Sequence, residues 1–165
     1  MISAKHSIVI NRPIHEVFEY LCDYDKRMYW HPNLVSQEHQ RLEKGARVNE
    51  VRNVLGRRVE IEGEITEFVA DHRLTFRGHG PQVKRLEYHY VLQPEGNGTR
   101  VGTEIDLELT DAFELAKPVI QRMTDRELDN TMSLLRDVLE MEHAHAAAEL
   151  LPQHHHHRKP TGTTG

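Results

Sequence analysis

The order of hydrophobic and polar positions along the chain predicts a sheet that folds against one long helix. Residues 7–11 form a β-branched run, and Pro13 then opens a helix with apolar residues every three or four positions. These apolar residues are Ile14, Val17, Phe18 and Leu21. A second short turn or helix is expected over 24–30, ending at His31 because a residue before a proline avoids the helical region.

Alternation of apolar and polar residues replaces the helical period between residues 34 and 109. It is clearest over 59–65, where Val59, Ile61 and Ile65 alternate with glutamates. Turn signals divide this stretch into six strands, at 43–45, 55–57, 70–72, 78–81 and 95–98. With the first strand they make seven, and the short turns between them predict an antiparallel meander.

Pro118 opens a final helix whose broad apolar stripe reaches about Glu142. The stripe contains Val119, Ile120, Met123, Leu128, Met132, Leu135, Val138 and Leu139. We therefore predict one α+β domain over 1–145, in which a curved seven-stranded sheet wraps around this helix, with two short helices after the first strand. Residues 146–165 include four consecutive histidines and little to bury, so we expect a disordered His-rich tail. A sheet curled against one helix can leave a cavity for an apolar small molecule.

Composition excludes several function classes. With 38% hydrophobic and 28% charged residues among 165, the chain fits one soluble domain. No apolar run approaches the roughly 20 residues that span a bilayer, and the N-terminus lacks a signal-peptide pattern, so we expect no membrane insertion and a cytoplasmic location. The net charge of −5 argues against nucleic-acid binding. Cys22 is the only cysteine, so no internal disulfide can form.

Motifs for catalysis or cofactor binding are not found in the sequence. It has no nucleophile elbow, paired-cysteine motif, zinc-protease motif, phosphate-binding loop or dinucleotide fingerprint. His143 and His145 are the nearest approach to a metal pair, but residues two apart on a helix point in different directions. We therefore expect neither a cofactor nor a metal site.

Candidate catalytic residues lie in one strand, where Tyr88 and Tyr90 alternate with Glu87 and His89. Leu92 shares the parity of the tyrosines, so we predict that the tyrosines face the cavity and His89 faces outward. Inward phenols can orient a ligand carbonyl or act as general acids. Alternatively, they are core residues whose hydroxyls bond to backbone or water. With the opposite orientation, His89 would be the acid or base inside.

Further candidate ligand-binding residues are Trp30, Arg52, Phe76, Met123 and Met132, in addition to the two tyrosines. Trp30 is either a lid over the cavity or a brace between the short helices and the sheet, and loop lengths place the entrance near it and the 78–81 turn. An inward Arg52 would need a partner and would suggest an anionic ligand group such as a carboxylate. On the outer face it would be a solvated side chain.

Several motifs resemble one known superfamily. They are Arg12-Pro13-x-x-Glu16-Val17-Phe18-x-x-Leu21, then Trp30-His31-Pro32, and Gly98-Thr99-Arg100-Val101 before the long helix. Over roughly residues 3–142 the chain resembles the START-related SRPBCC superfamily, particularly its polyketide cyclase/dehydrase-like branch. The resemblance implies a helix-grip fold with a ligand cavity between the sheet and the C-terminal helix.

Three functions are compatible with this resemblance, because fold alone does not select among them. The first is binding of a hydrophobic small molecule such as a lipid, a polyketide or an aromatic compound. The second is an aromatase/cyclase-type enzyme that promotes aldol cyclisation and dehydration of a polyketide. The third is a protein-interaction module like the co-chaperone members. Whether the protein is an enzyme stays open at this point.

Overall fold

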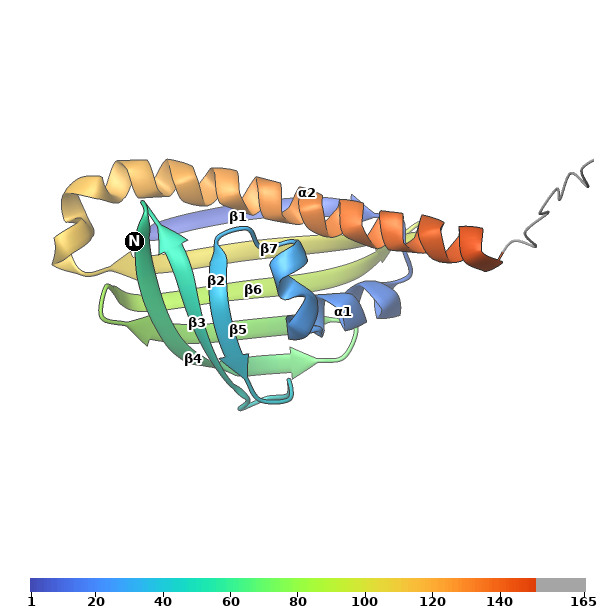
Figure 1. Cartoon of the computed structure of the whole chain (residues 1–165), viewed down its shortest axis with the longest axis horizontal. Coiled ribbons are helices and arrows are strands. Elements are labelled where there is room, and N and C mark those ends of the chain that lie inside the picture. Colours follow the sequence, from blue (N-terminus) through green and yellow to red (C-terminus); the bar gives the residue numbers. More distant parts are fainter. Residues whose placement is uncertain (151–165) are drawn as a thin grey trace, which may run out of the picture.

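The computed structural model describes residues 1–150, so the four consecutive histidines of the sequence lie outside the described residues. Seven strands, two α-helices and two 3₁₀ helices make up the domain (Figure 1). In chain order the elements are β1 (Ile2–Ile10), α1 (Ile14–Cys22), the 3₁₀ helix η1 (Tyr24–Tyr29), β2 (Leu34–His39), β3 (Arg47–Val54), β4 (Arg57–Val69), β5 (Arg73–Gly80), β6 (Val83–Glu95), β7 (Gly98–Leu109), the 3₁₀ helix η2 (Asp111–Ala116) and α2 (Lys117–Leu150).

The strands form a single antiparallel sheet in the order β1-β7-β6-β5-β4-β3-β2. Strands β2 to β7 are therefore a meander, and β1 pairs with the last strand of that meander. Figure 1 shows the curved sheet with α2 running along β1. The predicted seven-stranded helix-grip fold is confirmed, with the two short helices between β1 and β2.

Helix α2 covers the inner face of the sheet with its apolar stripe. Leu128, Met132 and Leu135 are buried on this side. The helix continues past Glu142, where the stripe ends, to Leu150. The alanines at 146–148 have high helix propensity, and His145 and Glu149 pair at 3.0 Å one turn apart. These local interactions extend the helix although its last turns bury no apolar stripe. The helix thus crosses the predicted domain boundary at 145, and residues 151–165 of the predicted tail lie outside the described residues.

Two glycines shape the inner face of the sheet. Gly63 of β4 lies opposite Gly78 of β5, and a Cβ at either position would come within 2.6 or 2.8 Å of the Phe76 ring. The ring can lie over this pair only because neither residue has a side chain. Phe76 stacks on Tyr88 with ring centroids 4.6 Å apart. The sheet therefore carries a layer of aromatic rings at its centre.

No helix in the part of the chain that the structure describes is long and apolar enough to cross a membrane. The domain is held together by the burial of the α2 stripe and of the inward residues of the strands.

Candidate functional site

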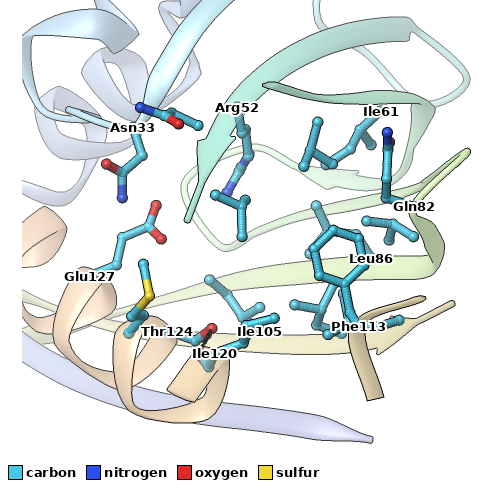
Figure 2. Close-up of a pocket in the computed structure, with 17 residues that line it drawn as sticks. Asn33, Arg52, Ile61, Gln82, Leu86, Ile105, Phe113, Ile120, Thr124 and Glu127 are labelled. Carbon is cyan, nitrogen blue, oxygen red and sulfur yellow. Dashed lines mark hydrogen bonds between the residues drawn. The ribbon is translucent and has the colours of Figure 1, made fainter. Parts of the chain in front are cut away.

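A pocket lies between the sheet and the first turns of α2. Its walls come from β3, β4, β6, β7, η2 and α2, and its volume is about 60 Å³. The lining residues are Asn33, Arg52, Asn53, Val54, Val59, Ile61, Gln82, Val83, Leu86, Ile105, Leu107, Leu109, Phe113, Ile120, Met123, Thr124 and Glu127 (Figure 2). Most of these are aliphatic, because they are the inward residues of alternating strands.

Polar groups gather at one end of this pocket. Figure 2 shows Arg52 extending from β3 and Glu127 from α2 on opposite walls of that end, with Asn33 beside them. Gln82 lies at the other end, beyond Leu86. The pocket therefore has a long apolar wall and one charged end, which is the usual arrangement for an amphipathic ligand.

Arg52 belongs to a buried ionic network. Its Nε donates to Oε2 of Glu50 at 2.6 Å, and Nη1 of Arg27 donates to Oε1 of the same carboxylate at 2.5 Å. The Glu50 side chain is fully buried. Burial by itself would raise the pKa of Glu50, but the charges and hydrogen bonds of Arg27 and Arg52 hold it well below its ordinary value. Glu50 is therefore ionised and serves both arginines.

Two tyrosines complete this network. Burial raises the pKa of Tyr88 well above its ordinary value, so the phenol keeps its proton and donates it to Oε1 of Glu50 at 2.9 Å. The hydroxyl oxygen of Tyr88 in turn accepts from Nη2 of Arg27 at 3.0 Å and lies 2.9 Å from the Tyr24 hydroxyl. Because the Tyr88 proton is directed to Glu50, Tyr24 is the donor in that last contact. Arg27 also lies over the Tyr24 ring, 4.5 Å from its centroid.

The two arginines differ in the number of hydrogen-bond donors that remain without a partner. Arg27 is only 1% exposed and is enclosed by Glu50 and the tyrosine rings. The two terminal nitrogens of Arg52 have no hydrogen-bond partner among residues 1–150, and the side chain lines the pocket. Burial would lower the pKa of Arg52, but Glu50 and, more weakly, Glu127 raise it. Arg52 therefore presents a positive charge and free donors to the pocket.

The sequence-predicted tyrosines lie on the inner face, but neither lines the pocket. Tyr88 and Tyr90 are buried at 1% and 4% exposure, whereas His89 faces the other side of the sheet. There its Nδ1 lies 3.1 Å from Oγ1 of Thr75 and its Nε2 lies 3.0 Å from Glu87. Tyr88 is a core residue, but its hydroxyl bonds to the side chains of the network and not to backbone or water.

The other predicted ligand-binding residues divide between the pocket and the core. Arg52 and Met123 line the pocket. Phe76 and Met132 are fully buried core residues away from it. Strand and helix periodicity predicted that all four side chains lie on inward faces. Periodicity does not show which end of the interior is left unfilled, so it could not separate pocket residues from core residues.

Trp30 lies in the packed part of the interior. It is 1% exposed and packs against His31 and Tyr90, with ring centroids 4.6 and 6.3 Å away. It is thus a brace between η1 and the sheet. The most exposed lining residues of the pocket are Asn53 and Met123, so the pocket opens between β3 and α2 rather than at Trp30.

Sequence reasoning missed several functional positions. Glu50 lies two residues before Arg52, and strand parity places both on one face, so that pair was readable from the sequence. Glu127 follows Met123 by one helical turn, which was a second available signal. Arg27 carried no such signal, because its place in a short 3₁₀ helix does not predict the partner that η1 folds onto.

Two buried nitrogens beside the network lack partners in the described chain. They are Nε1 of Trp30 and Nε2 of His31. Burial, followed by the charges of Arg27 and Arg52, lowers the pKa of His31 well below its ordinary value. His31 is therefore a neutral imidazole. Elsewhere in residues 1–150, His, Cys, Asp and Glu do not gather in groups of three or more that could hold a metal ion.

Residues 1–140 match the family model described as polyketide cyclase/dehydrase and lipid transport, so the chain belongs to this family. A comparison of the sequence with curated proteins finds no match.

Three solved structures illustrate the shared fold. The protein TTHA0849 from Thermus thermophilus is 22% identical, with a TM-score of 0.75 over 85% of this chain and 98% of that one. A START superfamily protein from Mycobacterium smegmatis is 11% identical, with a TM-score of 0.71 over 86% and 99%. The Zhui aromatase/cyclase from Streptomyces sp. R1128 is 14% identical, with a TM-score of 0.72 over 84% and 93%. These likenesses establish the START-like fold.

Proposed function

We propose that this protein binds a hydrophobic small molecule, such as a lipid, a polyketide or an aromatic compound, in the pocket between the sheet and α2. The observation that carries the proposal is the guanidinium of Arg52, which offers free donors at the end of an otherwise aliphatic pocket. A ligand with an apolar body and a terminal carboxylate or carbonyl fits both features.

The network makes Arg52 a prepared binding group. Glu50 holds Nε of Arg52 at 2.6 Å, so little side-chain freedom is lost when a ligand binds the terminal nitrogens. Arg27 and Tyr88 bind the other carboxylate oxygen, so Glu50 does not need to release Arg52 in exchange for the ligand. A ligand carboxylate would meet a fixed cation in a site of low polarity, where charge-assisted hydrogen bonds are strong.

The pocket volume limits the part of the ligand that enters. About 60 Å³ corresponds to roughly four to six water molecules, at 10–15 Å³ of such volume for each. A segment of acyl chain or a single aromatic ring fits this space, and a larger ligand would extend past Met123 into the mouth. The proposal therefore favours slim ligands over fused polycyclic ones.

Paired probes that differ only in charge test this proposal. Decanoate and decanol share an alkyl chain, and binding of each can be followed by calorimetry for the wild type and for Arg52→Gln. We expect Arg52→Gln to weaken decanoate binding about 10- to 100-fold, as for a lost hydrogen bond to a charged group, and decanol binding less than about threefold.

Arg77→Gln is the matched control, because Arg77 is exposed on the outer face of β5 and does not line the pocket. It should leave both affinities unchanged. Equal losses for decanoate and decanol in Arg52→Gln would contradict the role of Arg52. Failure of the wild type to bind any of decanoate, decanol and the single-ring probe benzoate would contradict the ligand-binding function itself.

A cyclase activity is the second candidate, and Glu127 is the observation that favours it. Its carboxylate lies across the pocket from Arg52 and is half-buried. Glu127 would remove a proton from the carbon between two ketones while Arg52 stabilises the resulting enolate oxygen. That enolate carbon would then attack a second carbonyl of the chain, and Glu127 would return the proton to the alkoxide oxygen that forms. Turnover of a poly-β-ketone that Glu127→Gln abolishes, with binding retained, would support this activity.

A further inference from the structure

The mouth of the pocket is surrounded by exposed aliphatic side chains. On one side lies the β3–β4 turn, where Leu55 is 41% exposed, and on the other lies the start of α2, where Val119 and Met123 are 48% and 36% exposed. Leu115 of η2, just before α2, is fully exposed. Figure 1 shows the β3–β4 turn next to the first turns of α2. Exposed apolar side chains that gather at one opening are typical of a surface that contacts another molecule or a membrane.

Leu55 is the least expected of these residues. It occupies the first position of a two-residue hairpin turn with φ of 53°, and Gly56 follows with φ of 75°. Both angles lie in the left-handed region, where Asn or Gly is favoured and a leucine is strained. The side chain is not buried in compensation. A strained and exposed leucine points to a contact made with another surface.

Unpaired arginines flank the same aliphatic residues. Arg57 follows the β3–β4 turn, and Arg122 and Arg126 lie beside Val119 and Met123 on α2. All three are exposed, and none lies within ion-pair distance of a carboxylate in the described part of the chain. This clustering occurs in a chain whose net charge is −5, so it is a local excess of positive charge.

Acidic residues of the same helix segment are turned elsewhere. Asp129 pairs with His6 of β1 at 3.3 Å, and Asp125 accepts from Gln121, whose amide also bonds to Ser3 of β1. They therefore lie on the β1 side of α2, away from the mouth. Glu127 points into the pocket and Glu114 lies near the Met1 ammonium. The surface around the mouth is thus aliphatic and basic.

We infer that this mouth surface docks on an anionic lipid bilayer. We define it as Leu55, Arg57, Leu115, Val119, Arg122, Met123 and Arg126. Its aliphatic tips would enter the headgroup boundary while the arginines bind lipid phosphates, which is how a protein lies on a membrane without spanning it. The inference rests on the proposed function in one respect: a mouth facing the bilayer lets an amphipathic ligand enter or leave the pocket without crossing water.

Vesicle sedimentation tests the docking directly. The full chain is mixed with vesicles of phosphatidylcholine alone or with about 30 mol% phosphatidylglycerol, and the bound fraction is measured from about 50 to about 300 mM NaCl. We expect binding to the anionic vesicles only, with affinity that falls as salt rises. The combined variant Arg122→Gln and Arg126→Gln should weaken it about 25-fold, at about fivefold for each arginine.

Leu55→Asn separates docking from folding. Asparagine tolerates the left-handed region, so this variant should be at least as thermally stable as the wild type and yet bind vesicles about tenfold more weakly. Val69→Thr is the matched control, because Val69 is 45% exposed at the far end of β4. Arg73→Gln is the control for charge, and both controls should bind vesicles like the wild type.

The possible outcomes distinguish this inference from the proposed function. Equal binding to phosphatidylcholine and anionic vesicles, or no binding to either, would overturn the docking. Neither result would bear on the proposed function, which is tested separately by decanoate binding in solution. A dimer in sedimentation that Leu55→Asn dissociates, or an acidic protein held by the arginines while vesicles are ignored, would also overturn it. Salt-sensitive binding to anionic vesicles that Leu55→Asn weakens supports it, with or without decanoate uptake.

Discussion

The two ends of the space between the sheet and α2 are filled differently. At the closed end, around Tyr88 and Trp30, planar rings and guanidinium groups pack against one another. At the open end, around Ile105 and Ile120, branched aliphatic residues leave a pocket of about 60 Å³. The same architecture supports both, so the volumes of the side chains, and not the fold, decide where a cavity remains.

The charges at the two ends also differ. At the closed end, Arg27 and the Tyr88 hydroxyl find their partners within the network, which centres on Glu50. At the open end, Arg52 shares the same carboxylate but directs its terminal nitrogens to the pocket. A closed network of buried charges thus supports one charge that is available to a ligand. Substitutions at the closed end should therefore affect stability, whereas substitutions at the open end should affect ligand binding.

Removing the charge of Glu50 should have the largest effect. Glu50→Gln leaves Arg27 and Arg52 buried without a counter-ion, so we expect the free energy of unfolding to fall by about 3–5 kcal/mol. Urea denaturation at neutral pH measures this loss. Glu62→Gln is the control, because Glu62 pairs with His79 on the exposed face and should cost less than about 1 kcal/mol. A loss below about 1 kcal/mol for Glu50→Gln would show that the arginines do not depend on this carboxylate.

A larger side chain should destabilise the protein more at the closed end than at the open end. Ile65 is fully buried in the packed core, so Ile65→Phe should destabilise the protein by about 1–3 kcal/mol through overpacking. Ile105 lines the pocket, so Ile105→Phe should cost less than about 1 kcal/mol while abolishing decanoate binding. Thermal and urea denaturation of the two variants gives the comparison directly. Equal losses of stability would mean that the pocket is not an available space.

Acid should weaken the closed end through His31. Its pKa is lowered in the folded protein, so the unfolded state binds protons more readily, and stability is full above about pH 6.5 and falls as the pH drops below it. The fall contributed by one such histidine is up to about 1.4 kcal/mol per pH unit. We expect His31→Gln to reduce this slope, measured by urea denaturation between about pH 7.5 and about pH 5.5.

His72→Gln is the matched control for this pH dependence, because it removes an imidazole that is exposed and not buried. The window lies above the range in which Glu50 takes up a proton, so the effects of the two buried groups stay separate. Identical slopes for wild type and His31→Gln would contradict the assignment of a buried neutral imidazole.

Much of the fold was predictable because its signals are local. Alternation over 59–65 and the helical period of 119–139 depend only on neighbours a few positions apart, and both elements form as expected. Two members of the predicted stripe, Val119 and Met123, are nevertheless exposed, because the sheet does not cover this side of the first turns of α2. The inward direction of Tyr88 followed from strand parity in the same way. The end of α2 was placed too early because burial was used as the signal, whereas alanine propensity carries the helix to Leu150.

The sequence by itself determined the order of elements and the faces of the strands, because each depends on residues close in the chain. The placement of Glu50 and Arg52 on one strand face is local in the same way, although Glu50 was not predicted as a site residue. Tertiary structure alone decided that Arg27, 23 residues away, would meet Glu50, and that Tyr88, 38 residues away, would join them. Curvature of the sheet and the position of η1 bring these groups together and fill one end of the interior. The pocket lies at the other end because the aliphatic side chains there are too short to meet across the same space.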